Sequence, residues 1–415
     1  MASFNIHTQE FILKISDFTL STKVIATLKK RADIGKPVNI LLGSHNIAYA
    51  NIIGDDSTET EEKFLALTSQ IKAISPKSLL MIEAEGGVIQ KIRIPLAPVL
   101  FPSSLAFKLF YEKLRTYLYS RIQDDLIELL RDEIYIFFRM SETMKAHIDI
   151  KALIESHLSE PDPNKPAGEN EKAILITSTL IEINYEVMSR NIKKYGADVI
   201  LAPVADFYDG NVGLIQSRSF GSDPHLISKF CIAALKGIKN SGLKNCLRHF
   251  VGQGQARDVN NRVNDPNQVI LNYHGSMEDL MATEGLVFKL IFEEYTDVDY
   301  MMLANITLSN ITEDLPIKPL LLSPKILNML FETTKVPKST TIITMDVFNM
   351  PITKHLKDKH DKILIVKEIA EGLYKDLNRN SMILIHHSIE DFEKLGGFEA
   401  LDKITPYSPQ FEAPQ

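Results

Sequence analysis

Eight short β-rich runs alternate along the chain with helix-length segments of mixed polar and apolar residues, and this alternation constrains the fold most strongly. Runs this apolar are typical of parallel strands covered by helices. Parallel neighbouring strands need crossover connections, so the repeat predicts an α/β fold. Eight repeats are enough for a TIM-type (β/α)8 barrel, whose geometry can be regular or irregular. The predicted strands span 11–20, 38–43, 78–83, 199–206, 244–250, 299–306, 341–347 and 381–387.

The interval after the third predicted strand is much longer than the others. It runs from residue 84 to residue 198, whereas a whole strand–helix–strand unit needs about 30 residues. Apolar residues recur there at helical spacing, and a stretch rich in Pro, Gly, Glu and Lys follows. We interpret 108–172 as a helical insertion and linker. Its role is one of four alternatives: an accessory packing element, an oligomerisation surface, a contact surface for a protein partner, or a lid over the barrel mouth. The remaining predicted parts are a barrel formed by 1–107 and 173–405, and a C-terminal tail at 406–415.

Composition excludes several classes of function. The net charge of −7 gives no electrostatic footprint for nucleic acid. The chain has 2 cysteines, too few for a disulfide framework, and no apolar run long enough to span a membrane. It shows no targeting segment and no dinucleotide or metal-binding motif. We therefore expect a cytoplasmic protein without a metal or cofactor.

Polar motifs follow several predicted strands, at the end where barrel enzymes place their active sites. Residues 83–91 (EAEGGVIQK) follow the third strand, and 202–206 (APVAD) end the fourth. Residues 218–224 (RSFGSDP) come next, 248–254 (RHFVGQG) close the fifth strand, and 344–350 (TMDVFNM) close the seventh. This ordered series resembles the barrel domain of glycoside hydrolase family 3, in its branch of bacterial β-N-acetylglucosaminidases.

The resemblance spans roughly 36–107 and 173–390. It implies a cofactor-free enzyme with a carbohydrate substrate. Asp206, at the end of the fourth predicted strand, is interpreted as a structural carboxylate that anchors neighbouring loops.

The resemblance also implies sugar-binding residues. Glu83 and Lys91 stand where the family has an aspartate and an arginine, and Arg248 and His249 stand where it has a lysine and a histidine. Arg218 either holds an N-acetyl carbonyl or hydroxyl of the sugar, or forms a salt bridge to a neighbouring strand-end acid.

The nucleophile of the family is an aspartate at the end of the seventh strand. Asp346 occupies the matching position, so the resemblance implies that its carboxylate attacks the anomeric carbon in a retaining, double-displacement mechanism.

The general acid/base of the family is missing from its usual place. The family has Asp-Ser-His after the glycine-rich loop, whereas residues 259–261 here are Val-Asn-Asn, none of which exchanges a proton near neutral pH. Asp258, one residue earlier, and His274, further along the chain, are the candidates for a replacement acid.

Two functions are therefore compatible with the sequence. The first is a glycosidase that acts on β-linked N-acetylglucosamine or a related sugar, with Asp346 as nucleophile. The second is a catalytically inactive barrel that binds a sugar or a protein partner, with 108–172 as the contact surface for that partner or for another copy of the chain. A binding protein needs no acid.

Overall fold

The structure is a computed structural model, and its description is confined to part of the chain. The described residues are 9–15, 20–42, 57–86, 89–90, 103–119, 152, 169–210, 215–258, 269, 271–311, 320–344, 347, 365–366, 368–369, 372–373 and 377–385.

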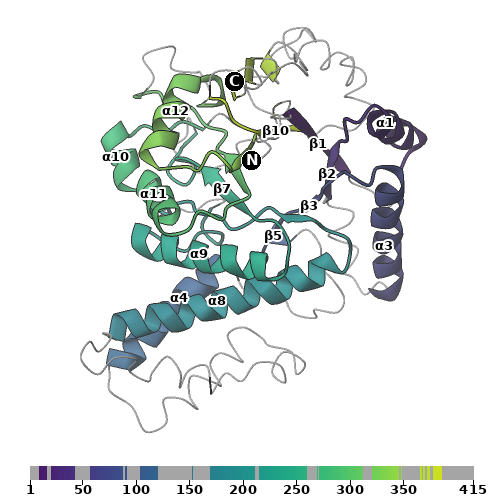
Figure 1. Cartoon of the computed structure of the whole chain (residues 1–415). Coiled ribbons are helices and arrows are strands. Elements are labelled where there is room, and N and C mark those ends of the chain that lie inside the picture. Colours follow the sequence, from purple (N-terminus) through teal and green to yellow (C-terminus); the bar gives the residue numbers. More distant parts are fainter. Residues whose placement is uncertain are drawn as a thin grey trace, which may run out of the picture.

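Parallel strands form the centre of the molecule (Figure 1). They are β1 (Gln9–Ile15), β2 (Asn39–Leu42), β3 (Leu80–Ile82), β6 (Val199–Ile200), β7 (Cys246–Phe250), β8 (Tyr300–Leu303), β9 (Thr341–Ile343) and β10 (Ser381–Ile385). Their order in the sheet is β6-β3-β2-β1-β10-β9-β8-β7, and every pairing in it is parallel. Each strand therefore lies beside its neighbours in the chain, with β1 beside β10.

The two end strands of that order, β6 and β7, are joined to each other. Val199 forms a parallel bridge with Lys244, and Val204 forms another with Arg248. A backbone hydrogen bond from Ile200 N to Lys244 O measures 2.9 Å on the same seam. The sheet thus closes on itself, as the predicted (β/α)8 barrel requires.

The interior of the barrel is filled by side chains from all eight strands. Alternate residues of a strand point to opposite faces, so each strand contributes to this interior and to the outer layer. The interior cluster consists of Ile12, Leu41, Met81, Val199, Leu201, Cys246, Tyr300, Met302, Ile343, Met382 and Leu384. A larger core lies between the strands and the helices, and Ile40, Leu80 and Leu247 are among the strand residues in it.

Helices lie around the outside of the strands (Figure 1). They are α1 (Thr22–Asp33), α3 (Ser57–Ile74), α4 (Ser104–Tyr119), α8 (Glu169–Lys193), α9 (Pro224–Asn240), α10 (Met277–Ala282), α11 (Glu284–Glu294) and α12 (Pro324–Thr333), with a short 3-10 turn at Leu320–Leu322.

Several of these helices begin at side-chain caps. Ser21 accepts a hydrogen bond from Val24 N, and Asp223 accepts one from His225 N before α9. Ser276 and Asp279 form a reciprocal capping box at the start of α10. Polar residues thus fix where the chain turns from loop to helix.

Helices α4, α8 and α9 pack against one another on one side of the barrel (Figure 1). Gly237 allows α9 to approach α8 closely, because a Cβ atom there would lie 2.2 Å from Glu182 O. On α4, Phe107 and Leu114 are buried in the larger core. The predicted limits of the insertion, 108 and 172, fall within α4 and α8, and most of the intervening chain lies outside the described residues. The domain division therefore stays a prediction.

The predicted strands are all present, with differences at their ends. The first spans Gln9–Ile15, and α1 begins after its cap at Ser21. The regular part of the fourth is only Val199–Ile200, since Pro203 has no N–H to donate to a ladder. Isolated pairing continues along this segment to Val204.

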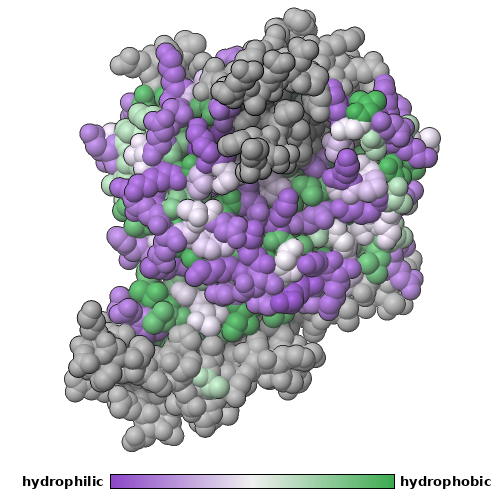
Figure 2. Space-filling view, in the orientation of Figure 1, coloured by the Kyte–Doolittle hydropathy of each residue, from purple (hydrophilic) through white to green (hydrophobic). Residues whose placement is uncertain are grey.

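Polar residues dominate the face seen in Figure 2, and apolar residues form small, separate groups on it. The large apolar side chains that are exposed are spread over several elements: Ile34, Leu65, Leu109, Leu175 and Met329. Within the described part of the chain, no helix combines the length and the apolar character needed to cross a membrane.

Candidate active site

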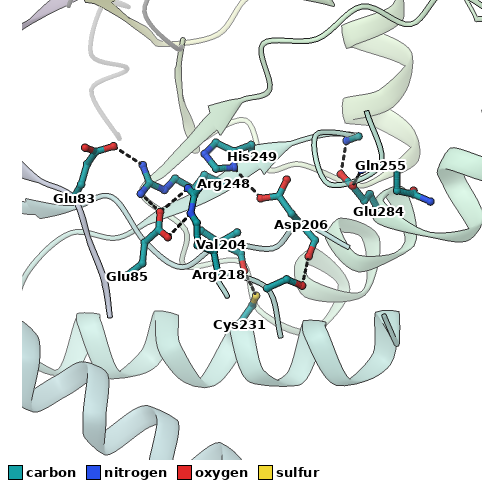
Figure 3. Close-up of polar contacts among 12 residues, drawn as sticks. Glu83, Glu85, Val204, Asp206, Arg218, Cys231, Arg248, His249, Gln255 and Glu284 are labelled. Atoms are coloured by element: carbon teal, nitrogen blue, oxygen red, sulfur yellow. Dashed lines mark hydrogen bonds and ion pairs between the residues drawn. The ribbon is translucent and has the colours of Figure 1, made fainter. Parts of the chain in front are cut away.

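A cluster of charged side chains lies at the carboxyl ends of β3, β6 and β7 (Figure 3). The short antiparallel pair β4 (Ala84–Gly86) and β5 (Ile89–Gln90) extends from the end of β3 and carries part of it. This end of a parallel barrel is where its loops build active sites.

Glu85, on β4, is the centre of the cluster. Its carboxylate receives two hydrogen bonds from the Arg218 guanidinium, from Nε at 2.7 Å and from Nη2 at 2.8 Å. It receives a third from Arg248 Nη2. All three side chains are buried. Burial raises the pKa of Glu85, but the positive charges of Arg218 and Arg248 outweigh that effect and hold the pKa below its usual value.

Arg248, on β7, bridges two acids. Besides Glu85 it contacts Glu83, from Nη1 to Oε1 at 3.2 Å. Glu83 is 24% exposed, whereas Arg248 is 2% exposed, so Glu83 forms the outer edge of this network. Burial lowers the pKa of Arg248, but Glu85 and then Glu83 more than compensate and raise it. Arg248 is therefore a permanent cation.

His249, the next residue on β7, pairs with Asp206. Its Nδ1 lies 2.8 Å from Asp206 Oδ2, and both side chains are buried. Burial lowers the pKa of His249, and the opposing influence of Asp206 does not offset this. The imidazole is thus neutral at pH 7, with the proton on Nδ1 donated to Asp206 and with Nε2 left as an acceptor.

Asp206 also fixes the segment that carries Arg218. Its backbone oxygen accepts a hydrogen bond from Ser219 Oγ at 2.7 Å. Among the described residues its own Oδ1, which is buried, has no hydrogen-bond partner. Asp206 therefore holds His249 on β7 through its carboxylate and the segment of Arg218 through its backbone oxygen.

The loop that follows β7 is held from within the protein. Glu284, the first residue of α11, accepts hydrogen bonds from Gly252 N and, at 3.2 Å, from Gln255 N. Burial, followed by the negative charge of Asp206, raises the pKa of Glu284 well above its usual value, although the loop N–H groups act in the opposite direction.

The structure brings four of the predicted sugar-binding residues together: Glu83, Arg218, Arg248 and His249. Of the two roles considered for Arg218, the structure contains the salt bridge, and its partner is Glu85. Contact of these side chains with a sugar stays a prediction.

Two further predicted residues, Lys91 and Asp346, lie outside the described residues, as do 259–261. Of the acid candidates, Asp258 is buried, in the segment after β7. His274 is exposed, with Nδ1 3.0 Å from Asn272 Nδ2. The sequence reasoning missed Glu85 and Glu284. For Glu85 a signal existed, since it stands at the glutamate of the motif that 83–91 resembles.

Cys231 and Cys246 are buried free thiols. Among the residues that the structure describes, no group of three or more His, Cys, Asp or Glu is arranged to hold a metal ion.

Fold and site together define the class: a TIM-type barrel with a polar cluster on its carboxyl-terminal face. Comparison with known proteins gives the family. Residues 172–359 match the model of the glycosyl hydrolase family 3 N terminal domain.

Curated relatives are β-hexosaminidases. One, from Neisseria gonorrhoeae (strain NCCP11945), is 28% identical over 108 residues, which cover 26% of this chain and 28% of that enzyme. Another, from Xylella fastidiosa (strain M12), is 34% identical over 77 residues, which cover 18% of this chain and 23% of that enzyme. Thus the alignments span less than a third of these relatives.

Solved structures resemble the whole fold. The native NagZ structure from Neisseria gonorrhoeae has a TM-score of 0.62 at 17% identity, over 98% of this chain and 87% of that one. The β-N-acetylglucosaminidase structure from Thermotoga maritima has a TM-score of 0.57 at 16% identity, over 95% and 63%. At such identities the likeness establishes the fold alone.

Proposed function

We propose that this protein is a glycosidase that hydrolyses β-linked N-acetylglucosamine or a related sugar with retention of configuration. The observation that carries the proposal is the buried network of Glu85, Arg218, Arg248, His249 and Asp206 at the carboxyl ends of the barrel strands. A barrel enzyme acts at this end. The family match and the β-hexosaminidase relatives support the same reaction class.

Each side chain of the network has a role suited to a neutral sugar. Arg218 and Arg248 donate to hydroxyl or N-acetyl oxygens, and both are pre-oriented by Glu85. Glu83 and His249 Nε2 accept hydrogen bonds from hydroxyl groups. Lys91 adds a further donor.

The chemistry is a double displacement. The Asp346 carboxylate attacks the anomeric carbon, the bond to the leaving group breaks, and an acid protonates the departing oxygen. Water then attacks the glycosyl–enzyme ester, gives up a proton to the same acid/base group, and releases the sugar and the free Asp346 carboxylate. Asp258 and His274 are the two candidates for that group.

Hydrolysis of an activated aryl β-N-acetylglucosaminide tests the proposal. An aryl leaving group of low pKa needs little protonation, so cleavage is expected even if the acid is weak. Asp346→Asn should lower kcat by about 10³-fold or more, while the exposed Asp33→Asn, on α1, should leave it unchanged. Equal activity in Asp346→Asn and the wild type would contradict the assignment of the nucleophile.

A second function is favoured by one observation: residues 259–261 (VNN) lack any group able to transfer a proton. A catalytically inactive barrel that binds a sugar or a protein partner needs no such group. Titration of N-acetylglucosamine into the protein, together with assays on aryl glycosides, distinguishes this inactive barrel from a glycosidase. Binding without turnover of any aryl glycoside would support a sugar-binding protein, and the absence of both would support a protein-binding role.

A further inference from the structure

We propose that Glu284 and Arg257 are positioning residues that together hold the loop 251–258 in its functional conformation; we call this pair the loop clamp. This segment follows β7, which carries His249, and it includes Asp258, the residue before the place where the family carries its acid/base. The catalytic side of this inference rests on the proposed glycosidase function, whereas the conformational side does not.

The Glu284 carboxyl group binds the N–H side of the loop. It accepts from the backbone of Gly252 and Gln255, and it is completely buried at the start of α11. Gly252 has φ 99°, a left-handed conformation that favours glycine. At Gly254, a Cβ atom would lie 2.1 Å from Phe207 O and 2.9 Å from Glu284 Oε1. The loop therefore has the backbone that this close approach requires.

The Arg257 guanidinium binds the C=O side of the same loop. Its Nη1 donates to Gly254 O at 3.2 Å and to Ala256 O at 3.0 Å. Its Nη2 contacts Asp209, which lies on the loop after β6. The carboxyl group of Glu284 thus accepts from backbone N–H groups of the loop, and the guanidinium group of Arg257 donates to its backbone carbonyl groups.

The end of the loop is fixed as well. Arg257 and Asn272 form an antiparallel bridge, with N to O distances of 2.9 and 2.8 Å in the two directions. The Asn272 side chain in turn accepts a hydrogen bond from Thr307 Oγ1 at 2.8 Å, beyond the end of β8. The backbone next to Asp258 is therefore held by both the clamp and the segment that follows β8.

A buried carboxyl group costs free energy that an apolar residue of the same size would avoid. Its presence at Glu284 is accounted for by the loop N–H groups of Gly252, which is buried, and of Gln255, which is half-buried. The clamp thus specifies one conformation of the loop, which follows the strand of His249 and contains Asp258.

The test uses three substitutions in the full chain: Glu284→Leu, which removes both acceptor oxygens, Glu284→Gln, which keeps one, and Arg257→Lys, which removes the planar fork. Glu294→Leu, at the exposed end of the same helix, is the matched control. Amide hydrogen exchange in 251–258 should accelerate about tenfold or more in Glu284→Leu, with partial rescue in Glu284→Gln and no change in β8. Unchanged loop exchange in Glu284→Leu and Arg257→Lys would overturn the clamp.

Kinetics with two substrates separate positioning from folding. If the clamp positions a proton donor, Glu284→Gln and Arg257→Lys should lower kcat by about 10–100-fold on a glycoside with a poor leaving group. They should change kcat little on an activated aryl glycoside, and KM by less than about twofold. A loss of folded protein would lower both rates equally, and that result would overturn the catalytic role. Absence of turnover in the wild type would contradict the proposed function, and hydrogen exchange would then decide the clamp by itself.

Discussion

Glu85 supplies one carboxylate to two buried guanidinium groups, and this single residue organises the candidate site. Its partners are separated from it by 133 and 163 residues along the chain, so its role could not be read from local sequence. Arg218, Arg248 and His249 could be singled out from the sequence because each lies in a recognisable motif, and their contact with a sugar stays a prediction. Their mutual contacts depend on how the barrel brings strand ends together, which one sequence does not specify.

Glu85→Gln should destabilise the protein by about 3 kcal/mol at pH 7, because it leaves two buried cations short of negative charge. Since the folded-state pKa of Glu85 lies below its usual 4.5, this stabilisation is present above about pH 4.5 and is lost as the pH falls through the lowered value. Urea unfolding at several pH values measures the effect, with the exposed Glu62→Gln as control. A loss below about 1 kcal/mol at pH 7 would contradict this account of Glu85.

His249 should be neutral at pH 7 and gain its proton only below pH 6.5, because burial lowers its pKa despite the contact with Asp206. Below pH 6.5 the unfolded chain takes up a proton on this histidine more readily than the folded protein does. The free energy of unfolding should therefore be highest above pH 6.5 and should fall as the pH drops through the lowered pKa. Nitrogen-15 chemical shifts of the imidazole should show the Nδ1–H tautomer at pH 7. An imidazolium signal at that pH would disagree with the geometry.

At the scale of elements, the eight strands were predictable because parallel strands buried on both faces require continuous apolar runs. Their ends were less so. Pro203 interrupts the ladder of β6, and the cap at Ser21 comes directly after the predicted end of the first strand. The clamp residue Glu284 was not predictable, since an acid at the start of a helix is ordinarily explained by the helix dipole.

Gly237→Ala should force α8 and α9 apart, because the added Cβ would meet Glu182 O at 2.2 Å. We expect a loss of about 2–3 kcal/mol in the free energy of unfolding. Gly372→Ala is the matched control, since its nearest atom, Pro324 Cβ, lies at an ordinary 3.6 Å. Equal stabilities of the two variants would show that the helices adjust without cost.

At the scale of the whole molecule, closure of the barrel depends on the seam between β6 and β7. The amides of Ile200 and Cys246 donate across this seam, to Lys244 O and Ala202 O. In a closed barrel they should be protected from hydrogen exchange as strongly as the amides of β8. Residue-resolved exchange measurements test this, and fast exchange of both amides would instead indicate an open sheet with two edges.

Closure matters for function because it brings the ends of β3, β6 and β7 into one cluster, to which Asp346 is proposed to contribute the nucleophile. The most direct measurement is capture of the glycosyl–enzyme with a 5-fluorinated N-acetylglucosaminyl fluoride, which reacts quickly with a retaining glycosidase and is released slowly. Mass spectrometry of the digested protein should show one sugar attached to the peptide that contains Asp346, and none in Asp346→Asn. Hydrolysis of the reagent or of aryl glycosides without any label on that peptide, or a label on another carboxylate, would contradict the mechanism.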